Sequence, residues 1–304
     1  MRSSRALRAL AWGAVAVGVA APLARRRLRL PPPAVTVLSF QAPVALALAT
    51  PRTRLRDSAM YALQMWAYFA HYDMPDDDPE ALLARTRVDY PIAVDRAIGC
   101  GETPTTRLQR ALSRPGEVHW VDVGLSCVHW AWFAIPHGTV AYLLLRHPER
   151  FPRGAALMAA TFDLGLVVYW TVPTAPPWYA AETGRMEPVR RIMVECGEQC
   201  WKGLWRPLYS SLEGNPFAAM PSLHFGTSVM AARLLSEVGR APGALGWSYA
   251  MALGFGLVYL GEHYLVDLLA GYALAEVVSR GAPLATPAIA RAARAVGRLE
   301  PGAA

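Results

Sequence analysis

Apolar residues occur in long blocks that short polar connections separate. Each block approaches the roughly 20 residues that a helix needs to cross a bilayer. The blocks in the second half of the chain are residues 154–172, 222–238, 243–260 and 264–278, and the earlier ones are 6–24, 35–50 and 118–145. The pattern predicts an all-α fold: a polytopic transmembrane bundle of about six spans, with a helical cap or interfacial region at its outer end.

The N-terminal part leaves one alternative open. The basic start and apolar centre of the first block fit a signal peptide, but the arginines that follow it favour an uncleaved anchor. Residues 57–72 are short for a span and carry Gln64 and His71, so they form either a third span or a helix that lies along the membrane surface.

Composition supports a membrane protein and excludes a nucleic-acid binder. Of 304 residues, 54% are hydrophobic and 17% are charged. The net charge of +7 comes from arginine, since Lys202 is the only lysine. These charges lie in short segments between apolar blocks, where anionic lipid headgroups are the natural partner.

The arginines also predict an orientation. They gather in the connection 146–153, around the turn 233–240 and in the tail after residue 280, and the positive-inside rule places these segments in the cytoplasm. The connections 171–221 and 261–263 are then outside. We therefore expect a multi-pass protein of the cell membrane in which His224 and His263, each at the start of a span, meet on the outer face.

An acidic run, Asp76, Asp77 and Asp78, is the one arrangement suggestive of a metal site. A structural role explains it better, because Asp78 followed by Pro79 is typical of a helix N-terminus. No similar ligand set recurs elsewhere in the chain, and we expect neither a metal nor another cofactor.

Two motifs carry the candidate chemistry. In NPFAAMPSLHFG (215–226), Pro221 at the first helical position and Ser222 as a cap explain a helix start but leave His224 unexplained. In GEHYLVD (261–267), His263 and Asp267 are four residues apart, so a helix would place the carboxylate beside the imidazole and fix its tautomer. The 39 residues between the two histidines fit one hairpin of spans.

A histidine at a helix mouth is more often a cap or an interfacial residue than a catalytic group. His71, His119, His129, His137 and His147 lie in comparable apolar surroundings without evident partners. The joint pattern of PSLH, a hairpin and HYxxD distinguishes His224 and His263 from them.

This joint pattern resembles the type 2 phosphatidic acid phosphatase superfamily, and most closely its branch with the inositol phosphorylceramide synthases. PTAPPWYAAE (173–182) is similar to a segment of the same branch. The resemblance covers roughly residues 154–280. We accordingly divide the chain into N-terminal anchor and amphipathic helices (1–116), a catalytic transmembrane domain (117–280) and a basic cytoplasmic tail (281–304).

The resemblance implies a metal-independent reaction. His263 would be the nucleophile that forms a phosphohistidine, Asp267 would orient it, and His224 would exchange protons with the leaving and incoming oxygens. Backbone amides at Pro221, Ser222 and Leu223 would hold phosphate oxygens. Trp178 and Tyr179 of the PPWY segment would contact the substrate.

The chain also departs from the family pattern. Gly256 and Leu257 stand where the family has Ser-Arg before the histidine, so the phosphate-binding cation must come from elsewhere. Lys202 and Arg206, four residues apart in the outer connection, are expected to project from one helix face over the histidines, with Arg185, Arg190 and Arg191 as the next candidates. Each could equally face solvent or lipid headgroups.

Three functions follow. The first is a membrane phosphotransferase that moves a phosphoryl-linked headgroup from a lipid phosphate to an alcohol, as in an inositolphosphotransferase, with a polyol such as inositol as a possible acceptor. The second is a lipid phosphate phosphatase, in which water is the acceptor. The third, a non-catalytic transporter or scaffold, is disfavoured because all three catalytic side-chain types are present and no half-chain symmetry is evident.

Overall fold

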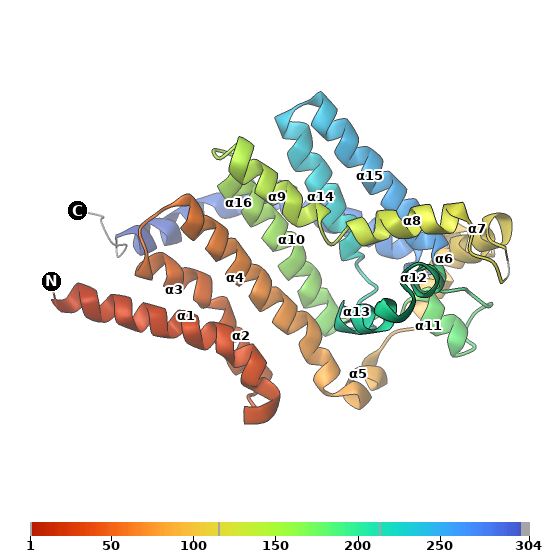
Figure 1. The fold of residues 1–304 in the computed structure, drawn as a ribbon, viewed down its shortest axis with the longest axis horizontal. Coiled ribbons are helices and arrows are strands. Elements are labelled where there is room, and N and C mark those ends of the chain that lie inside the picture. Colours follow the sequence, from red (N-terminus) through yellow and green to blue (C-terminus); the bar gives the residue numbers. More distant parts are fainter. Residues whose placement is uncertain (1, 115, 213, 299–304) are drawn as a thin grey trace.

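The structure, a computed structural model, describes residues 2–114, 116–212 and 214–298, and its regular elements in these ranges are helices (Figure 1). The predicted all-α fold is confirmed. In chain order the elements are α1 (Arg2–Leu28), α2 (Pro32–Phe40), α3 (Ala42–Ala49), α4 (Arg54–Asp73), η1 (Met74–Asp77), α5 (Pro79–Arg85), α6 (Asp89–Ile98), α7 (Pro104–Leu112), α8 (Trp120–Ala131), α9 (Ile135–Arg146), α10 (Phe151–Thr171), α11 (Pro177–Glu182), α12 (Ile192–Trp201), η2 (Lys202–Leu204), α13 (Trp205–Leu212), α14 (Leu223–Val238), α15 (Arg240–Tyr259) and α16 (Leu265–Gly297), where η marks a 3₁₀ helix.

Helix α14 is the centre of the bundle. It packs against α9, α10, α15 and α16. A helix that is apolar all round must be surrounded by other helices, and Val229, Met230 and Leu234 of α14 are indeed buried. The two ends of α14 therefore occupy fixed places in the fold, and His224 is in its first turn.

Helices α14 and α16 cross in close contact at a pair of glycines. A Cβ atom on Gly226 would lie 2.8 Å from the carbonyl oxygen of Gly271, and one on Gly271 would meet the carbonyl oxygen of Ser222. No real Cβ atom tolerates such an approach. Because glycine has no side chain, the start of α14 can lie in direct contact with the start of α16.

The N-terminal helices form a second layer. Helix α4 packs against α2, α3 and α10, and Met65, Ala67 and Tyr68 on it are buried. Residues 57–72 therefore belong to the helical bundle. By length and hydropathy, three described helical stretches can span a membrane: Arg5–Leu28, Pro32–Ala49 and Phe151–Thr171.

Two of the predicted blocks are interrupted. Block 35–50 is divided at Gln41 into α2 and α3, and block 118–145 is divided into α8 and α9 around residues 132–134. In both cases a proline, Pro43 or Pro136, is in the first two positions of the second helix, where its missing N–H and fixed φ start a helix rather than continue one. Helix α16, in contrast, continues past residue 280 to Gly297.

The acidic run has structural partners. Asp78 Oδ1 accepts from the backbone N–H of Ala81 at 3.1 Å, which confirms the predicted helix cap. Asp77 accepts from Arg25 and Arg26 of α1. Among residues 2–114, 116–212 and 214–298, no three His, Cys, Asp or Glu side chains are grouped as metal ligands.

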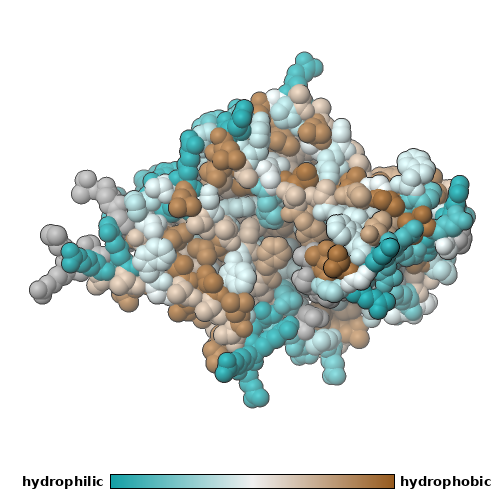
Figure 2. Space-filling view, viewed as in Figure 1, coloured by the Kyte–Doolittle hydropathy of each residue, from teal (hydrophilic) through white to brown (hydrophobic). Residues whose placement is uncertain are grey.

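Much of the surface is apolar. Figure 2 shows broad hydrophobic areas over the helices and hydrophilic side chains gathered at the edges. Leu23, Leu145, Leu245 and Leu284 are among the large apolar side chains that are mostly exposed. A soluble protein rarely exposes this much apolar surface, and a bilayer is the environment that covers it.

Candidate active site

The first histidine is held by a capped helix start. Ser222 precedes the first residue of α14, and its hydroxyl accepts from the N–H of Phe225 at 3.3 Å. The predicted cap is confirmed. Pro221 comes one residue before the cap, so its predicted place as the first helical residue is wrong. Its carbonyl instead accepts from the hydroxyl of Tyr169 at 2.8 Å.

The second histidine lies outside a helix. Helix α16 begins at Leu265 with Tyr264 as its N-cap, so His263 is one residue before the cap. The Asp267 carboxylate reaches back to accept from the Tyr264 N–H at 2.9 Å, and its Oδ2 also lies 3.4 Å from Nδ1 of His263. Both side chains are buried. The predicted pairing is present, but a helix-capping arrangement produces it rather than a shared helix face.

The two histidines contact each other directly. Nδ1 of His224 lies 3.1 Å from Nε2 of His263. An ionised carboxylate can only accept, so Asp267 places the proton of His263 on Nδ1 and leaves a lone pair on Nε2. His224 must then donate from Nδ1. In this state the Nε2 lone pair of His263 accepts a hydrogen bond from the Nδ1–H group of His224.

Aromatic neighbours fix the ring of His224. The ring centroid of Trp132 is 4.3 Å away and that of His129 is 4.9 Å away. Trp132 is itself held by a hydrogen bond from its indole N–H to the hydroxyl of Thr227 at 2.9 Å. His129 is buried. The sequence placed it among histidines without a partner, and no sequence spacing links it to His224.

Backbone hydrogen bonds join the two helix starts. The Ser222 N–H donates to the carbonyl oxygen of Asp267 at 2.9 Å, and the Leu223 N–H donates to the hydroxyl of Tyr169 at 3.4 Å. Proline has no N–H. In this structure the two N–H groups of residues 221–223 thus have acceptors within the protein, and that they hold phosphate oxygens stays a prediction.

A cavity of about 400 Å³ opens beside the histidines. Its wall is mostly aromatic, and it includes side chains from α4, a helix that the motifs did not implicate. Its polar groups come from the three histidines, Arg191, Glu262 and Asn215. The aromatic lining residues are Tyr68, Phe69 and Tyr72 of α4, with Trp130, Trp132, Phe133, Tyr169, Trp178, Trp201, Trp205 and Tyr209.

Arg191 is the cation on this cavity wall. Its guanidinium carbon lies 3.8 Å above the ring of Trp178 and 5.4 Å from that of Tyr209, and it donates to the Tyr209 hydroxyl. Its Nε is 3.5 Å from a carboxylate oxygen of Glu262, the residue before His263. Stacking and ion pairing together hold this charge close to the turn that carries His263.

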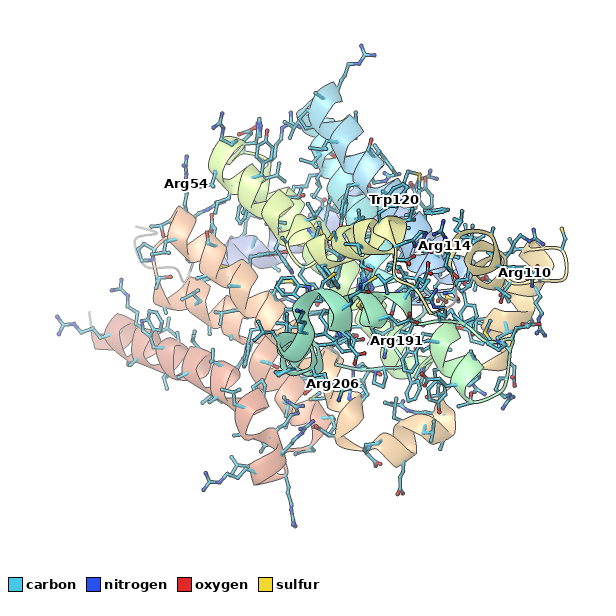
Figure 3. The ribbon with its side chains drawn as sticks, turned by 45° about the vertical axis from the view of Figure 1, so that its right-hand side comes forward. Arg54, Arg110, Arg114, Trp120, Arg191 and Arg206 are labelled. Atoms are coloured by element: carbon cyan, nitrogen blue, oxygen red, sulfur yellow. The ribbon has the colours of Figure 1, made fainter. Side chains whose placement is uncertain are left out.

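Lys202 and Arg206 do not line the cavity. Helix α12 ends at Trp201, and Lys202 has a left-handed φ of 48°, so the two cations do not project from one helix face as predicted. The Arg206 side chain is 85% exposed and lies 3.3 Å from Glu198 (Arg191 and Arg206 are labelled in Figure 3).

Some of the other predicted residues line the cavity and some do not. Arg185 pairs with Asp89 and Arg190 with Glu195, away from the histidines. Trp178 lines the cavity, whereas the ring of Tyr179 packs against Phe217 at 4.9 Å and is absent from the lining. Of the cations considered from the sequence, the structure brings Arg191 to the site.

Comparison with known proteins gives a family and two relatives. The family model described as PAP2 superfamily matches residues 105–280. The inositol phosphorylceramide synthase of Candida albicans is 28% identical over 166 residues, which are 52% of this chain and 34% of that protein. The catalytic subunit of inositol phosphorylceramide synthase from Schizosaccharomyces pombe is 25% identical over 169 residues, 50% of this chain and 39% of that one. The matched part is thus little more than a third of either relative. No solved structure matches.

Proposed function

The chain belongs to the PAP2 superfamily, and on that basis we propose that it is an integral membrane phosphotransferase that moves a phosphoryl-linked headgroup from a lipid to an alcohol through a phosphohistidine. The family acts on lipid phosphates, and the relatives are named for a product in which inositol phosphate is joined to ceramide. The observation that carries the proposal is the chain of contacts from Asp267 through His263 to His224.

The geometry supports a two-step reaction. Nε2 of His263 attacks phosphorus, and the bond from phosphorus to the lipid oxygen breaks. His224, protonated on both ring nitrogens for this step, gives its Nδ1 proton to that oxygen and becomes the neutral imidazole. In the second step an acceptor hydroxyl attacks phosphorus, returns a proton to His224 and releases His263. Reacting atoms need about 3 Å between them. The direct contact between the histidines must therefore open when phosphate enters.

In the proposed reaction Arg191 stabilises the negative charge that develops on the phosphoryl oxygens in the transition state. The phosphoryl oxygens become more negative in the transition state and need fixed positive charge nearby. Leu257 replaces the arginine that the family pattern supplies, and Arg191 on the cavity wall takes its place in the proposal. Glu262 orients that guanidinium.

The test is a transfer assay with purified protein. Phosphatidylinositol labelled at phosphorus is incubated in EDTA with ceramide, with inositol or with no added acceptor. We expect label to move to an alcohol acceptor as a phosphodiester, and we expect EDTA to leave the rate unchanged because the proposed steps use protein side chains alone. A parallel incubation contains labelled phosphatidic acid, a phosphomonoester, and free phosphate as its sole product, with no transfer from phosphatidylinositol, would instead favour the phosphatase.

Three basic segments support an active site that faces outside the cytoplasm. Arg153 pairs with Glu237 at 2.7 Å, and Glu276 pairs with both Arg233 and Arg280, so the three basic segments meet at the end of the bundle opposite His224. The positive-inside rule assigns that end to the cytoplasm.

Cysteine labelling in intact cells tests this orientation. In a background with the native cysteines changed to serine, Glu182→Cys should react with an impermeant maleimide and Glu149→Cys should not, although both positions are exposed. Both should react after the membrane is permeabilised. The reverse pattern in intact cells would place the active site in the cytoplasm. Glu213, a second outer position considered from the sequence, lies outside the described residues.

A further inference from the structure

The start of α16 is held by carboxylates from two different helices. Asp267 of α16 accepts from the Tyr264 N–H. Asp95, on α6, accepts from the next two amides: Leu265 donates to its Oδ2 at 2.8 Å and Val266 donates to its Oδ1 at 2.9 Å. The first free N–H groups of a helix need such partners, and here a distant helix provides two of them.

Asp95 is fully buried, so these hydrogen bonds are not incidental surface contacts. Burial raises the pKa of the Asp95 carboxyl, and the two amide hydrogen bonds partly oppose that increase. A buried carboxylate is costly unless hydrogen bonds compensate it. The positive end of the α16 dipole adds to the compensation.

Helix α6 makes a second contact at the same place. Ile92, one turn before Asp95, packs in a cluster with Ala180, Met186 and the fully buried ring of Tyr264. Tyr264 directly follows His263 in the chain. Helix α6 therefore fixes both the side chain and the backbone that come immediately after the proposed nucleophile.

We infer that Asp95 is a positioning residue for phosphoryl transfer. Asp95 acts through the first helical turn of α16. That turn contains Asp267 and directly follows the loop residue His263. The inference rests on the proposed function, because it assigns Asp95 to the alignment of His263 with phosphorus. Residue 95 precedes the segment that matches the family, 105–280, so the family match does not include it.

Three variants test the inference: Asp95→Ala, Asp95→Asn and, as a matched control, Asp89→Asn. Asp89 is on the same helix but is exposed and paired with Arg185. A displacement near 1 Å costs about a hundredfold in rate, so we expect Asp95→Ala to lower kcat about 30- to 100-fold. KM should change less than about threefold because the cavity wall is intact. Asp95→Asn keeps one acceptor oxygen and should lose less, and Asp89→Asn should match the wild type.

Orthovanadate binding supplies a readout that does not depend on the lipid. Vanadate adopts the five-coordinate geometry of phosphoryl transfer, and the tryptophans of the cavity report its binding by fluorescence. We expect Asp95→Ala to weaken vanadate binding about tenfold in protein that melts cooperatively, and Asp89→Asn to leave it unchanged. If wild-type protein binds vanadate but transfers no lipid phosphate, the proposed function fails. The effect of Asp95→Ala can then still be measured as a change in vanadate affinity.

Two results would overturn the inference. One is a wild-type kcat and vanadate affinity in Asp95→Ala. The other is a loss of activity that follows only the amount of folded protein, with kcat per vanadate-binding site unchanged. If Asp95→Ala does not fold, Asp95→Asn carries the same comparison, and a wild-type kcat in that variant together with wild-type vanadate affinity overturns the inference equally.

Discussion

Replacement of His263 by alanine is expected to remove phosphoryl transfer almost completely, by about ten-thousandfold or more, as with other covalent nucleophiles. Nε2 of His263 is the atom that attacks phosphorus in the proposed reaction. Asp267→Asn should lose nearly as much, because an amide no longer enforces the tautomer with the proton on Nδ1. The measurement is initial transfer rate in detergent, with the protein content matched by size-exclusion chromatography.

A phosphoenzyme assay tests directly whether His263 is the nucleophile. The wild type should incorporate label that survives base and is lost in acid, the behaviour of a phosphohistidine, and His263→Ala should incorporate none. His147→Ala is a suitable control, since this histidine pairs with Glu149 in the opposite connection. Near-wild-type turnover by His263→Ala would remove the phosphohistidine from the mechanism.

Arg191→Ala is expected to have the largest effect after these changes to His263 and Asp267. Loss of one charged hydrogen bond to a transition-state oxygen costs about 2–4 kcal/mol in the barrier. That cost corresponds to a decrease in kcat of about 30- to 1,000-fold. Arg191→Lys keeps the charge but loses the planar stack on Trp178, so its kcat should fall between those of the alanine variant and the wild type.

Arg206→Ala is the matched control for this prediction. Arg206 belongs to the same outer connection, but its side chain is exposed and pairs with Glu198. Its kcat should remain within about threefold of the wild type, as expected for an exposed ion pair. If Arg206→Ala were the damaging change and Arg191→Ala were silent, the phosphate site would have to move to the α13 side of the cavity.

The sequence predicted that His224, His263 and Asp267 come together because its evidence was local. The four-residue spacing of His263 and Asp267 indicated a pair, and a pair is present, although the helix begins two residues after His263. An i to i+4 spacing brings side chains together in a helix, and it also does so where an acid at the third helical position reaches back past the cap. The prediction was right about the contact and wrong about its origin.

The same four-residue spacing led to a wrong prediction for Lys202 and Arg206, which do not project from one helix face. There the helix ends between the two residues, at a backbone conformation that a lysine rarely adopts and that sequence pattern does not indicate. Arg191 reaches the cavity because Trp178 and Tyr209, distant in sequence, stack against it.

The contributions of α4 and α6 could not be predicted for a related reason. Tyr68 lines the cavity and Asp95 caps α16, yet these residues precede His224 by more than a hundred positions. No periodicity within one segment encodes which distant helix will pack against another. Only the assembled bundle shows that the part of the chain before residue 105 completes the site.

The crossing of α14 and α16 at Gly226 and Gly271 also has a mechanical consequence. The two helices touch backbone to backbone there, within about one helical turn of His224 and Asp267. If a change in bilayer thickness alters the tilt of these helices, rotation about this crossing would move their far ends much more than His224 and Asp267. In that case the crossing would act as a pivot, and it would keep the distance between His224 and His263 nearly constant while the membrane around the protein thins or thickens.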